Sequence, residues 1–162
     1  MTCRLQPGDR AASHRRWRGR VWVVLLLTSL ALTVSAEEAG APARSAATSF
    51  GQALESADTR SLARHFPTSG RVRLQLDRLV GREHGFYSSQ QVVTLLRTFL
   101  QEGSVDGFTV IAVEAPTEQF ARVDATARIT NHKGVTRPAT LRLHLERERD
   151  RWVVRELREE AP

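Results

Sequence analysis

The sequence predicts a small α+β domain, residues 44–160, in which helices cover one face of an antiparallel sheet. Two observations predict this class. In the first part of the domain apolar residues recur every three or four positions, as on one side of a helix, and from Phe108 onward they mostly alternate with polar residues, as on half-buried strands. Helices followed by a run of consecutive strands are the order expected of an α+β architecture.

Three helices are expected before and between the strands. The first carries an apolar stripe with alternating steps of four and three residues: Ala43, Ala47, Phe50, Leu54 and Ala57. Asp58 is the expected N-cap of a short second helix, which Pro67 would end. Ser88 and Gln91 match a capping box for the third helix, and Gly103 is expected just after its last turn.

Alternating apolar and polar residues predict the strands, and glycines mark the loops and turns between them. Strands are expected over 72–76, 108–113, 121–129, 139–145 and 152–157. Gly81 and Gly85 bracket a predicted loop or irregular hairpin. Residues 131–134 form a predicted hairpin turn in which Gly134 takes a positive φ.

Residues 1–36 have the three parts of a secretory signal. Arginines precede an uncharged apolar run that begins at Val21, and small residues end it at Val34, Ser35 and Ala36. We expect cleavage after Ala36, a short linker over residues 37–43, and export to the periplasm or the medium. The alternative that stays open is an uncleaved anchor over residues 21–36 in the inner membrane, although this run is shorter than the roughly 20 residues that span a bilayer.

Removing the signal changes the composition of what remains. Residues 1–20 hold six of the 24 Lys and Arg and one of the 18 Asp and Glu, which leaves 18 basic and 17 acidic residues after residue 36. Such a nearly neutral domain lacks the cationic surface that nucleic acid binding requires. The single cysteine, Cys3, would be lost with the signal, which excludes disulfides and cysteine metal sites from the exported domain.

The order of elements resembles the nuclear transport factor 2-like cone, also called cystatin-like, in which N-terminal helices pack on a curved antiparallel sheet. The residues that carry the resemblance are the first helix with its acidic break (50–58), the helix start 87–91, the helix end 95–100 and the final strand at 152–154. A small exported subgroup of unassigned function is the most similar. The resemblance implies the fold and transfers no activity, because members of the superfamily range from isomerases and dehydratases to non-catalytic adaptors.

Strand parity predicts which side chains face the inside of the cone, where catalytic groups would lie. The faces of residues 121–129 and 139–145 that are expected to point inward carry no titratable side chain, and Asp124 and His144 fall on the opposite face among paired charges. Tyr87 and His84, in the predicted loop before the third helix, are the candidate ligand-facing pair. Asp124 joins them only if a bulge reverses the register of its strand.

The sequence therefore predicts an exported, non-catalytic domain that binds a protein partner or a small apolar ligand. No cofactor is expected, and the widely spaced histidines predict no metal site. The outward charged face is also a candidate surface for a homodimer. Two alternatives stay open: a small-molecule isomerase or hydrolase built on Tyr87, His84 and Asp124, and a membrane-tethered accessory protein of the cell envelope.

Overall fold

The computed structural model of the chain describes residues 40–76 and 83–160. The predicted signal, its cleavage point at Ala36 and the first residues of the predicted linker lie outside this part. The described chain contains a first helix, residues 40–55, then α2 (Thr59–Arg64) and α3 (Ser89–Glu102). Among these residues no helix combines the length and the apolar character needed to cross a bilayer.

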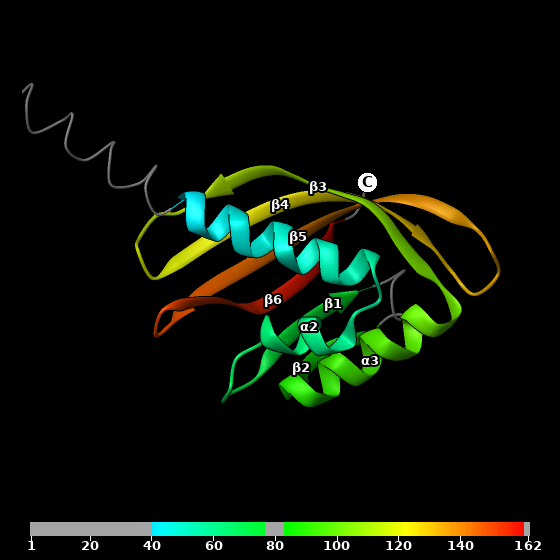
Figure 1. The fold of residues 1–162 in the computed structure, drawn as a ribbon, viewed down its shortest axis with the longest axis horizontal. Helices are drawn as coiled ribbons and strands as arrows, with labels where there is room; N and C mark the ends of the chain where they lie inside the picture. Colours follow the sequence, from blue (N-terminus) through cyan, green and yellow to red (C-terminus); the bar gives the residue numbers. More distant parts are fainter. Residues whose placement is uncertain (1–39, 77–82, 161–162) are drawn as a thin grey trace, which may run out of the picture. The chain divides into compact units, whose positions relative to one another are not determined.

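Six strands form one sheet in the order β2-β1-β6-β5-β4-β3. Their bounds are β1 (Val72–Leu76), β2 (Glu83–Tyr87), β3 (Ser104–Glu114), β4 (Phe120–Thr130), β5 (Thr136–Glu148) and β6 (Arg151–Glu160). Neighbouring strands are antiparallel except β1 and β6, which are parallel. Figure 1 shows the first helix lying across the long strands, with α2 and α3 beside β1 and β2. The predicted α+β class is confirmed.

The core lies between the helices and one face of the sheet. Burial alternates along β4 and β5, so the face of residues 121–129 and 139–145 that was predicted to point inward is buried. The first helix contributes Ala43, Ala47, Phe50 and Leu54, and α3 contributes Val92, Val93 and Leu96. These are the positions that the apolar stripes predicted.

Several boundaries differ from the prediction. The first helix begins at residue 40, so residues 40–43 of the predicted linker are helical, because Pro42 stands in the first turn where its missing N–H costs no helical bond. Ala57 lies outside the helix, with a φ of 53°. Residues 83–87, which were predicted to be loop or irregular hairpin, form β2 and pair with β1.

Two further differences concern chain ends and turns. The strand predicted over 152–157 continues to Glu160, because β5 is long enough to pair with it as far as Thr140. Gly103 does follow α3, but its φ is −140°, which any residue can adopt. A side chain is excluded there by the backbone oxygen of Thr130, which would lie 2.4 Å from a Cβ.

Candidate functional site

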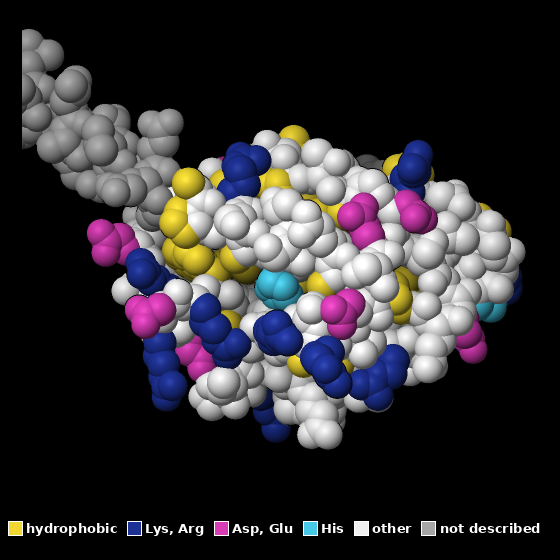
Figure 2. Space-filling view, viewed as in Figure 1, with side chains coloured by type: hydrophobic (Ala, Val, Ile, Leu, Met, Phe, Trp, Pro, Cys, Tyr) yellow, Lys and Arg dark blue, Asp and Glu magenta, His cyan; other side chains and the backbone are white. Residues whose placement is uncertain are grey.

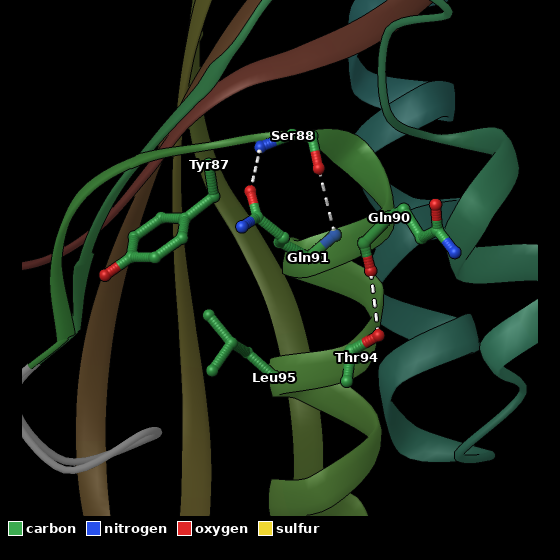
Figure 3. Close-up of a pocket in the computed structure, with 6 residues that line it drawn as sticks. All are labelled: Tyr87, Ser88, Gln90, Gln91, Thr94 and Leu95. Carbon is green, nitrogen blue, oxygen red and sulfur yellow. Dashed lines mark hydrogen bonds between the residues drawn. The ribbon is translucent and has the colours of Figure 1, made fainter.

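A groove opens between β2 and the first turns of α3. It encloses about 360 Å³ and is lined by Tyr87, Ser88, Gln90, Gln91, Thr94 and Leu95. Figure 3 shows the Tyr87 ring and the Leu95 side chain on the same side of α3, with open space between them. Tyr87 and Leu95 also pack against the buried core, so the walls of the groove are fixed by the fold.

Gly85 makes room for the wall that Tyr87 forms. The two residues alternate with Phe86 and therefore lie on the same face of β2. A Cβ at Gly85 would come within 3.2 Å of the Tyr87 ring and hydroxyl. The Tyr87 ring can therefore lie over residue 85, because that residue has no side chain.

The capping box fixes the rim of the groove where β2 passes into α3. The backbone N–H of Ser88 donates to Gln91 Oε1 at 2.9 Å, and the backbone N–H of Gln91 donates to Ser88 Oγ at 3.3 Å (Figure 3). The Thr94 hydroxyl donates to the carbonyl of Gln90 at 2.9 Å. Among the residues that the structure describes, no Asp, Glu, Lys, Arg or His lines the groove; the described walls are apolar and the rim carries neutral amides and hydroxyls.

The structure does not bring the three candidate residues together. Tyr87 lines the groove, half-buried, whereas His84 is exposed and three positions earlier on β2, which places it on the other face of the strand. Asp124 lies on that outer face as well, but β5, β6 and β1 stand between its strand and β2. Each remains a candidate on its own, and only Tyr87 contributes to the groove.

Asp124 is engaged in a paired network on the outer face of the sheet. Its carboxylate accepts from Arg142 Nε at 2.7 Å, and Arg142 Nη1 also lies 2.9 Å from Glu160 Oε1. The hydrogen bond with Asp124 is the main reason why the pKa of Arg142 is raised. These contacts support the interpretation of the outward face as charges paired across strands.

A carboxylate that the sequence analysis missed lies on the inner face. Glu159 pairs with Leu141 on β5 and is only 8% exposed. The strand predicted over residues 152–157 ends two residues before Glu159. Continuing the alternation from Leu157 by two residues is the signal that would have placed Glu159 inward.

A second cleft, lined mostly by polar residues, separates the first helix from α2. His65 lies there, half-buried at the end of α2 with its ring edge-on to Phe50 at 5.8 Å between centroids. Burial of the imidazole lowers its pKa, and the charges of Arg151 and Arg64 lower it further. Across the described residues, no three metal-ligating side chains are grouped closely enough to hold an ion.

Solved structures identify the architecture. A nuclear transport factor 2-like family protein from Streptomyces avermitilis is 18% identical, with a TM-score of 0.62 over 76% of this chain and 95% of its own. A ketosteroid isomerase-like protein from Erwinia carotovora atroseptica is 16% identical, with a TM-score of 0.58 over 76% of this chain and 97% of its own. The fold is the nuclear transport factor 2-like cone. The resemblance noted in the sequence is therefore confirmed at the level of fold.

Similarity to such cones extends to proteins of different activity. An LEH-like epoxide hydrolase from M. tuberculosis is 14% identical, with a TM-score of 0.55 over 74% of this chain and 82% of its own. No protein-family model matches the sequence, and no curated protein is similar to it. At these identities the cone is shared and the chemistry is not thereby assigned.

Proposed function

We propose that this cone is an exported, non-catalytic domain that binds a small apolar ligand in the groove between β2 and α3. The observation that carries the proposal is the contrast between the two sides of α3. Towards the sheet, Val92, Val93 and Leu96 are buried in a packed core, whereas the Tyr87 and Leu95 walls are open to solvent. Apolar walls with a few neutral polar groups are typical of sites for small apolar ligands.

The composition of the groove argues against acid–base catalysis within it. General acid–base catalysis needs a titratable group within hydrogen-bond reach of the reacting atom. Apart from the Tyr87 phenol, whose ordinary pKa is about 10, no lining residue in the described part of the chain has an ionisable side chain. The proposed binding function also includes a protein partner, which would insert an apolar side chain between the same walls.

A matched pair of variants on α3 tests the groove. Thr94 lines it, and Thr98 lies one turn later, also exposed and with its hydroxyl likewise bonded to the carbonyl four residues before it. We expect Thr94→Glu to weaken binding of the uncharged fluorescent probe N-phenyl-1-naphthylamine by about tenfold, because the carboxylate must lose water when the probe binds. Thr98→Glu should change the affinity less than twofold. Equal affinities in the two variants would place the probe elsewhere.

Export is a separate part of the proposal. Cell fractionation followed by sequencing of the mature N-terminus should find a product that starts at Glu37 outside the inner membrane. A membrane-bound product that retains Met1 would instead support the anchored, envelope-tethered alternative.

Glu159 favours the enzymatic alternative, because a buried carboxylate on the inner face of the sheet is a candidate general base. The epoxide hydrolase among the similar cones suggests an epoxide as substrate class. Hydrolysis of styrene oxide that Glu159→Gln abolishes would replace the binding proposal with this one.

A further inference from the structure

The cleft between the first helix and α2 differs in chemistry from the groove on α3. It encloses about 410 Å³, and most of its lining residues have polar or charged side chains. Ser49 and Gln52 line it from the first helix. Asp58, Ser61, Arg64 and His65 line it from α2 and its two caps.

Arg64 brings to this cleft a charge that is not held in an ion pair within the described part of the chain, although it acts on Asp58 at longer range and, after the hydrogen bonds from Ser61, helps to lower the pKa of that carboxyl. Within residues 40–76 and 83–160, no carboxylate oxygen lies within 4 Å of its guanidinium. Asp58, the nearest acid on the same helix, is occupied by the backbone N–H groups of Arg60 and Ser61 and by the Ser61 hydroxyl. The Arg64 guanidinium is therefore available to a ligand.

The end of α2 does not need this charge for its own stability. Arg151 Nη1 donates to the carbonyl oxygen of Arg64 at 2.8 Å, and Arg151 Nη2 lies 3.4 Å from that of Phe66. These bonds already satisfy the negative end of the helix. Figure 2 shows several Lys and Arg side chains along α2 and below it, with acidic side chains between them and a histidine at the surface.

His65 adds a neutral donor beside Arg64. Within the described residues its ring makes the edge contact with Phe50 and no side-chain hydrogen bond. Since burial and then the positive charges of Arg151 and Arg64 lower its pKa, the imidazole is neutral at pH 7 and carries one N–H donor. Asp58 and His65 cap opposite ends of α2, seven residues and therefore roughly 10 Å apart along the helix axis, so an anion beside His65 is separated from the Asp58 end of the helix.

We propose that this cleft binds the oxyanion group, a carboxylate or a phosphate, of a small acidic ligand. Arg64 supplies the charged donor, and the His65 imidazole and the Ser49 hydroxyl supply neutral donors from the two walls. Asp58 at the far end limits the length of anion that the cleft accepts, so a small acid fits it better than an extended polyanion.

The test is titration of the His65 imidazole by NMR in the full-length chain, with succinate and inorganic phosphate as separate probes. His65→Gln assigns the signal. A bound anion favours the imidazolium, so we expect a saturable rise of the His65 pKa with at least one probe. Whichever probe saturates at the lower concentration identifies the oxyanion as carboxylate or phosphate.

Two arginine variants separate a site from general attraction. Arg64→Gln should weaken the apparent affinity by about tenfold, as expected for the loss of one charged hydrogen bond. Arg60→Gln removes the same charge from α2 outside the cleft and should change it less than twofold. The proposal is overturned if neither probe gives a saturable change, or if the two variants weaken binding equally.

Discussion

His65 shows how one side chain can tie stability to pH. Its imidazole is half-buried against Phe50, and its pKa is lowered first by burial and then by Arg151 and Arg64. The folded state therefore holds the proton less tightly than the unfolded chain, whose histidine titrates near 6.5. The stabilisation from the neutral ring is present above about pH 6.5 and is lost as the pH falls towards the lower pKa of the folded state.

We predict that His65→Gln flattens the dependence of stability on pH between about 7.5 and 5. Urea unfolding midpoints should fall on acidification in the natural chain and fall less in the variant. Asp58 and Glu148, whose pKa values are lowered by hydrogen bonds to Ser61 and to Thr68 respectively, remain ionised over this range. His132→Gln, at the exposed turn between β4 and β5, serves as the control. Parallel curves for the natural chain and His65→Gln would contradict the prediction.

The close contact between the first helix and β3 depends on Gly51 in that helix. The Phe108 ring of β3 lies where a Cβ of residue 51 would stand, and the Phe108 backbone N–H donates to Glu55 Oε1 at 2.8 Å. The helix and the edge strand approach closely because this position has no side chain. Burial of the glycine is a feature of packing, since its own conformation is helical.

We predict that Gly51→Ala destabilises the fold by about 1 kcal/mol. Overpacking against the ring costs about 1–3 kcal/mol, and the better helix propensity of alanine returns up to about 1 kcal/mol. A double-mutant cycle with Phe108→Ala, measured by urea unfolding, checks the cause. In the Phe108→Ala background the same substitution should be neutral or stabilising; an unchanged cost there would show that the ring is not responsible.

The elements differ in how far the sequence predicts them. Local chemistry was sufficient for the Asp58 cap, the Ser88–Gln91 capping box and the turn at Gly134, because these bonds join neighbours in sequence. It was insufficient for β2, whose glycine and polar residues resemble a loop and which is a strand only because β1 pairs with it. The α3 groove was therefore only partly predictable: Tyr87 was identified, while the strand that positions it was not.

At the scale of the whole sheet, strand pairing determines which side chains lie in the core and which lie on the outer face. Parity along β4 and β5 correctly placed Asp124 and His144 on the outer face. The parallel pairing of β1 with β6 brings residues 73–75 beside 156–158, a long-range contact that has no local signal in the sequence. The length of β6 and the inward position of Glu159 follow from partner strands in the same way.

The α3 groove and the α2 cleft divide the proposed binding functions by chemistry. In the described part of the chain the groove offers apolar walls without formal charge, whereas the cleft offers Arg64 and neutral donors, with Asp58 also among its lining residues. An uncharged apolar probe and a small anion should accordingly bind independently. Thr94→Glu should weaken only the first, and Arg64→Gln only the second.

Apolar ligands should bind beside Tyr87, which is the single tyrosine of the chain and therefore a specific reporter on the groove. In a sample labelled with ¹³C only at tyrosine, the one set of ring signals reports on the groove. Titration with N-phenyl-1-naphthylamine should shift these signals saturably, at the concentrations at which the probe's fluorescence rises. A fluorescence rise with the Tyr87 signals unmoved would contradict the claim.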